Sequence, residues 1–242
     1  MRLTEVCALT FDVYGTLIDW ESGIAQTLMP WVQRQGIPAD RASLLASFAR
    51  HERRHQAANP DAPYPEVLAL VFTDIARDFG VRPTTAEADA FGGSVGDWPA
   101  FEDSAAALAT LGQHYKLGVI SNVDRASFTS SAKRLGIDFD IVVTAEDAGA
   151  YKPSPEPFQA AIEAMSELGV GVDQILHCAQ SLFHDHAPAR KLGLNTCWID
   201  RQNHAAGGTW GATPPPPGHP APHLRYPDLA SFAEDITAAR AA

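Results

Sequence analysis

The sequence predicts an α/β fold, a doubly wound (Rossmann-like) parallel sheet with a helical insertion near the start of the chain. Three observations support this prediction. Short apolar runs rich in strand formers recur along the chain, helical spacing separates them in its second part, and β-branched runs disappear between about residues 22 and 95. Strands that alternate with helices form parallel βαβ units, so the second part of the chain builds most of the sheet.

The first strand is expected over residues 6–11, where an apolar run ends at a turn that contains Gly15. The helical insertion follows, and Pro38, residues 59–63 and Gly80 divide it into several helices. Residues 1–19 and 98–242 therefore form an α/β core domain, and residues 20–97 form a helical domain. In the second part of the core we expect strands at 117–120, 140–144, 174–178 and 196–199, and helices at 105–111, 126–135, 157–168 and 187–191.

Charge and length limit the classes of partner. The chain has 242 residues, enough for a core with a modest second domain, and its formal net charge is −11. A nucleic-acid partner is not expected, because phosphate binding needs a basic surface. A small anionic substrate is compatible with this charge, since a few local cations decide whether it binds.

The N-terminal residues contain no long apolar segment and no cleavage signature, and no window is long enough to cross a membrane. Cys7, Cys178 and Cys197 lie in apolar runs typical of strands and lack the spacing of metal ligands. Buried, reduced thiols fit a reducing compartment. We therefore expect a cytoplasmic protein without a membrane partner.

Polar residues follow several of the expected strands. Asp12 follows the first strand, Ser121 and Asn122 follow the second, and Ser181 follows a later one. Open α/β sheets bind ligands at the carboxyl ends of their strands, so these side chains are expected at one site. In the segment Phe11-Asp12-Val13-Tyr14-Gly15-Thr16, backbone N–H groups of the turn and the Thr16 hydroxyl can hold an anionic group. A lone aspartate before such a turn is otherwise a helix cap.

The pattern Asp-x-Tyr-Gly-Thr-Leu at residues 12–17 resembles the first motif of the haloacid dehalogenase superfamily, whose nucleophile is that aspartate. Ser121, Lys152 and Asp185 resemble the later motifs and follow in the family's order. The resemblance implies that Asp12 attacks the substrate, that Ser121 binds a substrate oxyanion and that Lys152 keeps Asp12 ionised. It also implies that residues 20–97 are a cap domain.

Two residues indicate the branch of this superfamily. Phosphatases carry an acid two residues after the nucleophile, but this chain has Tyr14, whose ordinary pKa of about 10 makes it a poor proton donor. The fourth motif has Gln180 where phosphatases have a carboxylate, and Mg²⁺ prefers anionic oxygen ligands. Both residues resemble the metal-independent type II (S)-2-haloacid dehalogenases, so no metal and no cofactor is expected.

The resemblance implies a mechanism with a covalent intermediate. Asp12 displaces the halide from C2 of a 2-haloacid, and water then hydrolyses the aspartyl ester. Thr16, Ser121 and Lys152 would hold the substrate carboxylate or the Asp12 oxygens. Asp185 would position or activate the water, with its role shared by Ser181. Tyr14 completes the expected substrate-binding set.

The same branch uses a cap arginine to hold the departing halide. Arg50, Arg53 and Arg54 all lie on one expected helix, and Arg50 is preferred from the alignment of the preceding aromatic residue. The alternative for these arginines is a solvated charged face. Asn122 is expected as a second halide contact.

Two positions depart from the dehalogenase pattern. Phe158 stands where such enzymes usually have a tyrosine, and Leu182 stands where they have an asparagine. His184 and His186 flank Asp185; either could activate water, although histidines beside a helix start more often point outward. Another small carboxylic acid, such as one with a strained ring, is therefore an alternative substrate.

Two further functional alternatives stay open. A phosphatase would keep the same fold and depend on Mg²⁺, and a non-catalytic binding protein would keep the pocket without turnover. The resemblance to this branch also implies a homodimer.

Overall fold

Six parallel strands form one sheet in the order β3-β2-β1-β4-β5-β6. The computed structural model describes residues 3–208, 218 and 221–241. The α/β prediction is confirmed, and each of the five expected strands is present. The strands are β1 (Ala8–Phe11), β2 (Lys116–Ser121), β3 (Ile141–Thr144), β4 (Ile175–Ala179), β5 (Asn195–Ile199) and β6 (Leu224–Tyr226).

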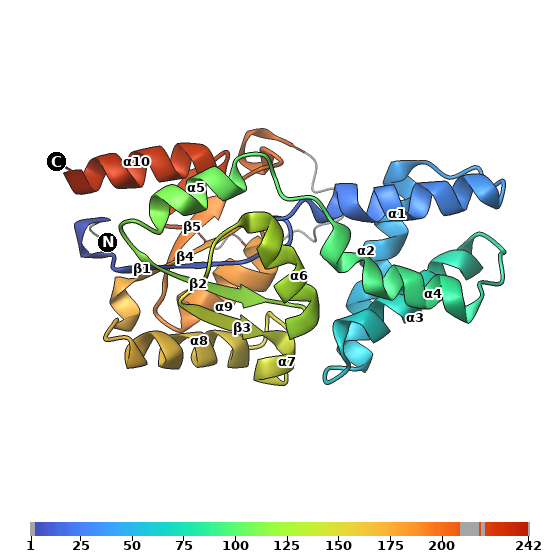
Figure 1. Cartoon of the computed structure of the whole chain (residues 1–242), viewed down its shortest axis with the longest axis horizontal. Coiled ribbons are helices and arrows are strands. Elements are labelled where there is room, and N and C mark those ends of the chain that lie inside the picture. The colour runs from blue at the N-terminus through green and yellow to red at the C-terminus, as the bar shows by residue number, and fades with distance from the viewer. Residues whose placement is uncertain (1–2, 209–217, 219–220, 242) are drawn as a thin grey trace.

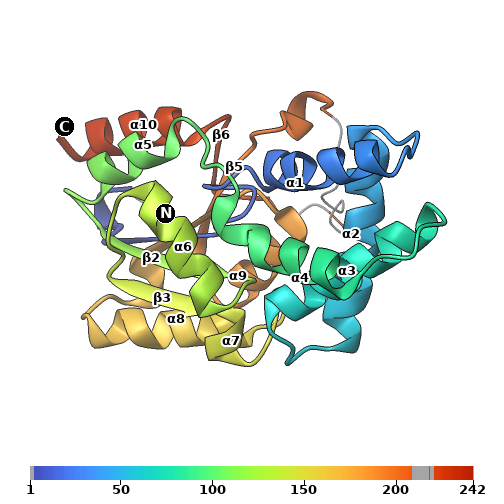
Figure 2. The same cartoon turned by 45° about the vertical axis from the view of Figure 1, so that its right-hand side comes forward.

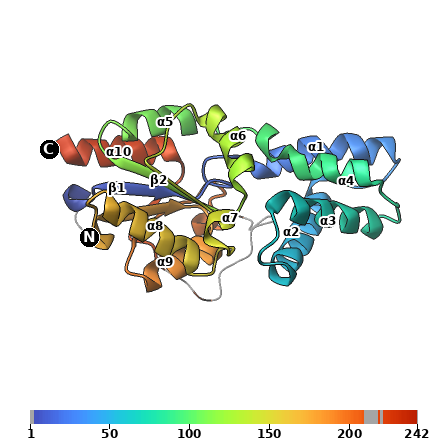
Figure 3. The ribbon, with the colours of Figure 1, turned by 60° about the horizontal axis from the view of Figure 1, so that its bottom comes forward.

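Helices cover both faces of the sheet, because neighbouring strand residues point to opposite faces. Leu9 of β1 packs into the larger apolar cluster with residues of α5 (Ser104–Leu111), α6 (Arg125–Leu135) and α10 (Leu229–Ala241). Ala8 packs on the other side with residues of α8 (Glu156–Glu167) and α9 (Ala187–Lys191). Figures 1 and 3 show these two helical layers with the sheet between them.

The helices between residues 20 and 97 form the cap segment. It comprises α1 (Trp20–Arg34), α2 (Arg41–Ala58), α3 (Tyr64–Asp78), α4 (Thr85–Gly92) and the 3₁₀ turn η2 (Gly93–Asp97). The side chains of Asp40 and Thr84 begin α2 and α4 with capping boxes, which explains where these helices start. In the interior of the cap segment, the Phe72 ring packs against the rings of Trp31 and Phe91. Figures 1 and 2 place this segment to one side of the sheet.

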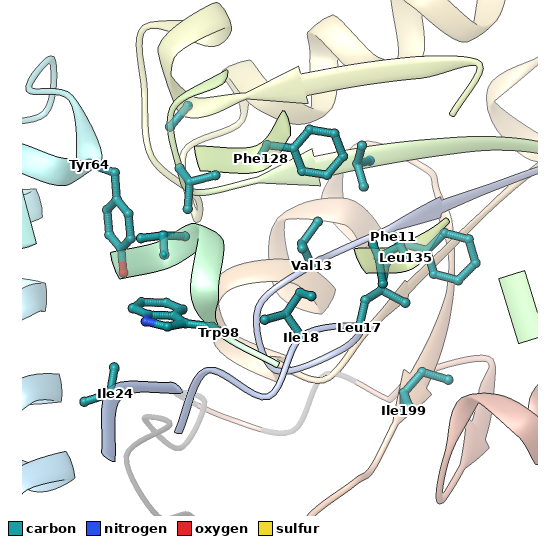
Figure 4. Packing of buried hydrophobic residues seen from close by; sticks show 14 of the residues in the cluster. Phe11, Val13, Leu17, Ile18, Ile24, Tyr64, Trp98, Phe128, Leu135 and Ile199 are labelled. Carbon is teal, nitrogen blue, oxygen red and sulfur yellow. The ribbon is translucent and has the colours of Figure 1, made fainter. Parts of the chain in front are cut away.

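The cap segment is joined closely to the core at Trp98. A Cβ atom on Gly23 of α1 would lie 2.3 Å from Cγ of the Trp98 ring, so only glycine permits this approach. The Trp98 ring is fully buried and contacts Tyr14 edge-on, with ring centroids 5.7 Å apart. Figure 4 shows Trp98 between Ile24 and Tyr64 of the cap segment and Ile18 of the core. This contact holds the cap segment over the loop that follows β1.

Among the α-helices and strands of the described residues, β6, α10 and the short α7 (Ala145–Ala148) go beyond the sequence expectations. α10 carried a usable signal, since Leu229, Phe232, Ala233 and Ile236 have helical spacing and are all buried. All three cysteines are free, as expected, but only Cys178 and Cys197 are buried, whereas Cys7 is partly exposed. Within the described residues, no helix is long and apolar enough to span a membrane.

Candidate active site

Asp12 lies directly after β1, in a tight turn that Gly15 makes possible. Gly15 has a φ of +102°, a conformation that favours glycine, and its N–H donates to the Ile18 carbonyl over 2.8 Å. The turn brings the Thr16 hydroxyl back to donate to Asp12 Oδ2 at 2.7 Å. Thr16 is itself fixed, because the backbone N–H of Gln180 donates to its Oγ1 at 2.9 Å. One carboxylate oxygen of Asp12 is thereby oriented by the strand end next to it.

Lys152 holds the other oxygen of Asp12. Its Nζ lies 2.8 Å from Asp12 Oδ1, 2.7 Å from Asp185 Oδ1 and 2.8 Å from the Ile120 carbonyl oxygen. An ammonium has three N–H donors, so these contacts use all of them. Lys152 therefore orients Asp12 and Asp185 and has no donor left for a substrate.

Lys152, Asp12 and Asp185 form a buried group, and the balance of charge within it sets the protonation of each side chain. Burial opposes the charge of Lys152, but the two carboxylates raise the pKa of the lysine above its ordinary value. Burial raises the pKa of Asp12, and Asp185 adds to this, while Lys152 and Thr16 oppose it. Burial also acts on Asp185, but Lys152 and His177 hold the pKa of Asp185 below its ordinary value. The group thus contains one ammonium shared by two carboxylates.

His177, on β4, completes the group from the interior of the sheet. Its Nε2 lies 3.1 Å from Asp185 Oδ1 and its Nδ1 lies 3.0 Å from the Thr10 hydroxyl. An ionised Asp185 only accepts, so Nε2 donates to it, and in a neutral ring Nδ1 then accepts from the Thr10 hydroxyl. Phe158 packs edge-on against the His177 ring, with ring centroids 5.4 Å apart. Phe158, which stands where the dehalogenases usually have a tyrosine, therefore packs against a histidine of the site.

A cavity of about 90 Å³ lies between this group and the cap segment. The core lines it with Asp12, Tyr14, Asn122, Val123, Lys152, Gln180, Ser181, His184 and Asp185. The cap segment and the residue that follows it contribute Trp20, Ala49, Glu52, Arg53, Gln56, Tyr64 and Trp98. The carboxyl ends of β1, β2 and β4 thus face one small cavity, and the acid Glu52 and the cation Arg53 line it from the cap segment.

The arginine that reaches this cavity is Arg53. Arg50, the arginine preferred from the sequence, does not line it: its guanidinium pairs with Asp78 of α3 at 2.5 Å and is mostly exposed. Arg54 likewise pairs with Asp74. Arg53 lies on the same helix, about one turn beyond Arg50, and its Nε donates to the Ala49 carbonyl. The choice of Arg50 is therefore corrected to Arg53, because α3 supplies acids to two of the three arginines.

The remaining predicted residues lie near Asp12 with different contacts. The Tyr14 hydroxyl is 2.9 Å from Ser131 Oγ on α6, and burial raises the pKa of Tyr14 above its ordinary value. The amide of Asn122 is occupied by the backbone of Lys152, accepting from its N–H and donating to its carbonyl oxygen. Ser121 Oγ is buried and has no hydrogen-bond partner among the described residues. Of these side chains, only Ser121 keeps a polar atom without a partner among the described residues, and Ser121 is not one of the residues that line the cavity.

Ser181 and the two histidines belong to the turn Leu182–His186. Ser181 Oγ accepts from the His184 N–H at 3.0 Å and so begins the turn. His184 lines the cavity, and burial lowers the pKa of His184 to about 4. His186 is buried and donates from Nε2 to the Ala179 carbonyl, so the expectation that both histidines point outward is wrong. Leu182 is buried as well.

Three residues of the site were missed in the sequence: Glu52, Tyr64 and His177. Tyr64 donates its hydroxyl to Glu52 Oε1 at 2.5 Å, and both side chains line the cavity. His177 is a histidine inside an apolar strand, which is a usable signal for a buried polar contact. Glu52 and Tyr64 stand on separate helices, and nothing in their spacing indicates that they meet.

The side chains that could offer oxygen ligands at this site, Asp12, Asp185 and Gln180, fit a divalent cation poorly. The Lys152 ammonium stands between the two nearest carboxylates, Asp12 and Asp185. The Gln180 amide is neutral, and its Nε2 lies 3.5 Å from both Gln202 Oε1 and His204 Nε2. No group of three or more histidine, cysteine or acidic side chains in the described part of the chain is placed to hold a metal ion.

Comparisons with known proteins identify the family of the chain. The family model of haloacid dehalogenase-like hydrolases matches residues 7–177. The 5-amino-6-(5-phospho-D-ribitylamino)uracil phosphatase YigB of Escherichia coli (strain K12) is 27% identical over 242 residues, covering 95% of this chain and 96% of that protein. (S)-2-haloacid dehalogenase 4A of Burkholderia cepacia is 25% identical over 206 residues, covering 81% of this chain and 84% of that protein.

The fold is also that of a solved structure. L-2-haloacid dehalogenase from Xanthobacter autotrophicus superposes with a TM-score of 0.81 at 18% identity, covering 96% of this chain and 99% of that chain. The sequence relatives thus include both a phosphatase and dehalogenases.

Proposed function

Because the chain belongs to the haloacid dehalogenase-like hydrolases, we propose that it hydrolyses a small (S)-2-haloacid through an ester on Asp12, without a metal ion. One observation carries this proposal. The residue two positions after Asp12 is Tyr14, whose hydroxyl is engaged by Ser131 and whose pKa is raised by burial. A phosphatase needs an acid at that place to protonate its alkoxide leaving group, whereas chloride leaves without one.

The first step is substitution at carbon. A carboxylate oxygen of Asp12 attacks C2, the C–halogen bond breaks, and the electron pair leaves with the halide. Thr16 and Lys152 hold the Asp12 carboxylate in place, so they position the nucleophile. Ser121 does not line the cavity, but its Oγ is buried without a partner among the described residues, and we propose that it donates to the substrate carboxylate. Arg53 on the cap side supplies the cation for the departing halide.

The second step is hydrolysis of the ester. Asp185 Oδ1 is held by Lys152 and His177, whereas its Oδ2 is buried without a hydrogen-bond partner in the described structure. An oriented carboxylate with one open oxygen can accept a proton from water as that water attacks the Asp12 carbonyl carbon. The ester oxygen leaves with a proton as the 2-hydroxyacid, and Asp12 is regenerated. We propose that residues 20–97 act as a cap domain that encloses both steps.

Halide release tests the proposal. We expect chloride from (S)-2-chloropropionate in the presence of a chelator, and no turnover by Asp12→Asn. In heavy-oxygen water, label should enter Asp12 over repeated turnovers, because water attacks the carboxylate carbon. Undiminished turnover by Asp12→Asn, or an absence of label in Asp12, would refute the ester mechanism.

A Mg²⁺-dependent phosphatase is the second candidate, and the 27% identity to the phosphatase of Escherichia coli over nearly the whole chain favours it. It predicts hydrolysis of a generic phosphomonoester that requires added Mg²⁺ and is abolished by a chelator. A screen of 2-haloacids and phosphomonoesters, each with and without chelator, separates the two candidates. Release from another small carboxylic acid, without metal and with label in Asp12, would keep the mechanism and change the substrate.

A further inference from the structure

Glu52 presents a carboxyl group to the cavity from the side opposite Asp12. It lies on α2, and both residues line the same cavity. Its Oε1 accepts from the Tyr64 hydroxyl at 2.5 Å and from Gln56 Nε2 at 3.3 Å. Its Oε2 has no hydrogen-bond partner among the described residues. One oxygen is therefore fixed by the cap segment, and the other is open to a ligand.

The contacts decide which oxygen carries a proton. Burial raises the pKa of Tyr64 well above its ordinary value, so its phenol stays protonated and must be the donor to Glu52. Oε1 accepts two hydrogen bonds, and the proton of a neutral Glu52 therefore resides on Oε2. Burial raises the pKa of Glu52 to about 7, with Tyr64 and Arg53 opposing this. Near neutrality the cavity thus contains an O–H donor on its cap side.

In-line attack gives this donor a specific place in the reaction. A leaving group departs on the side of C2 away from Asp12, and that side is formed by the cap segment. Arg53 offers a charge there but no transferable proton, and Tyr14 is engaged by Ser131. A neutral carboxyl also spares an anionic substrate the repulsion that a second carboxylate would cause.

Resting on the proposed function, we propose that Glu52 is the general acid for the leaving group and that the substrate class includes 2-fluoroacids. Asp12 attacks C2, the C–F bond breaks, and its electron pair leaves with fluorine while the Oε2 proton of Glu52 moves to the fluoride. Glu52 is left as a carboxylate and regains its proton from solvent. The net reaction consumes water and yields a 2-hydroxyacid and hydrogen fluoride. Fluoride is a more basic leaving group than chloride, so it gains more from this proton.

The test compares two leaving groups on one carbon skeleton. Release of fluoride from (S)-2-fluoropropionate and of chloride from (S)-2-chloropropionate is measured between pH 5.5 and 9. The wild type is compared with Glu52→Gln, with Tyr64→Phe and with Glu66→Gln, an exposed acid on α3 that serves as the control. General acids contribute about 10²–10⁴-fold, so Glu52→Gln should lower fluoride release about 10²-fold and chloride release less than 10-fold.

The pH profile adds a readout that a structural role would not move. Wild-type fluoride release should fall above about pH 7, as Glu52 loses its proton. Glu52→Gln should abolish this alkaline limb. Tyr64→Phe should move it to higher pH, because the Tyr64 hydrogen bond lowers the pKa of Glu52. Glu66→Gln should match the wild type.

Three outcomes would overturn the inference. Equal losses of fluoride and chloride release in Glu52→Gln would show that Glu52 has only a structural role. An alkaline limb that neither Glu52→Gln nor Tyr64→Phe changes would show that another group titrates there. Chloride release without any fluoride release by the wild type would contradict the inference and leave the proposed function intact. Release of neither halide would refute the proposed function itself.

Discussion

Nε2 of His177 lies 3.1 Å from Oδ1 of Asp185, and both side chains are completely buried. The histidine thereby shares Asp185 Oδ1 with Lys152, while Asp185 Oδ2 has no hydrogen-bond partner among the described residues. A buried acid that works on water needs such fixed partners, since its orientation decides which oxygen faces the water. His177 is in this sense a positioning residue.

Removing His177 should slow the second step more than the first. A hydrogen bond to a charged group contributes about 1.5–3 kcal/mol, so His177→Leu should lower kcat about 10- to 100-fold. Because ester hydrolysis becomes slow, a covalent adduct on Asp12 should accumulate and be visible by mass spectrometry of the intact protein. His177→Gln keeps an N–H donor and should recover part of the rate. A loss of activity without accumulated adduct would contradict this role.

The two arginines of α2 make a matched pair for testing the anion site. Arg53→Ala removes the guanidinium from the cavity and should lower kcat/KM for a 2-haloacid by about 10-fold or more, as a lost charged hydrogen bond predicts. Arg50→Ala leaves the cavity lining unchanged and breaks a hydrogen bond to Ser47 and an exposed pair with Asp78, a pair worth less than about 1 kcal/mol. Steady-state kinetics of both variants check this. Equal losses would show that the cap segment does not discriminate between them.

Lys152→Met should abolish activity and destabilise the protein. Removing one partner of a buried ion pair costs about 3–5 kcal/mol, because the remaining charge is left uncompensated. Adding Asp185→Asn removes one of the two carboxylates that Lys152→Met leaves without a cation. The double variant should therefore regain part of the lost free energy of unfolding without regaining turnover. Urea denaturation of the single and double variants measures the stability. A double variant no more stable than the single one would contradict the charge balance described above.

Acid should destabilise the fold through His186. Its Nε2 donates to the Ala179 carbonyl, and its Nδ1 is buried without a partner among the described residues, so protonation has no acceptor to meet. Burial lowers the pKa of His186 to about 4, whereas an unfolded histidine titrates near its ordinary value of 6.5. The lowered pKa contributes stability that is fully present above pH 6.5 and is lost as pH falls toward 4.

Thermal unfolding at pH 7, 6 and 5 measures this effect. His186→Gln keeps a donor for Ala179 without a titrating ring, and its melting temperature should fall less than that of the wild type over this range. His114→Gln, which changes an exposed histidine, is the control. A variant with the same pH dependence as the wild type would refute the assignment to His186.

Much of the buried polar group around Asp12 was evident in the sequence because its members follow local rules. Asp12 and Thr16 stand in a strand-to-turn segment whose geometry depends on neighbouring residues, and Gly15 provides the positive φ of that turn. Lys152 and Asp185 were found by their order in a family pattern. The structure brings all four within hydrogen-bonding distance in a chain of contacts. Parallel strands explain this, since their carboxyl ends meet at one edge of the sheet.

The cap side of the cavity was decided only by the tertiary structure. Arg50 and Arg53 lie on one helix about 60° apart around its axis, and periodicity does not tell which of them faces the core. The packing of α3 against α2 decides which arginine lines the cavity, because Asp78 of α3 pairs with Arg50. The pairing of Glu52 with Tyr64 joins two helices, and that of His177 with Asp185 joins a strand to the turn beyond it. The sequence by itself thus indicated Asp12 as the expected nucleophile, together with its immediate partners Thr16 and Lys152. Which side chains face it across the cavity depends on contacts that form only when the helices pack.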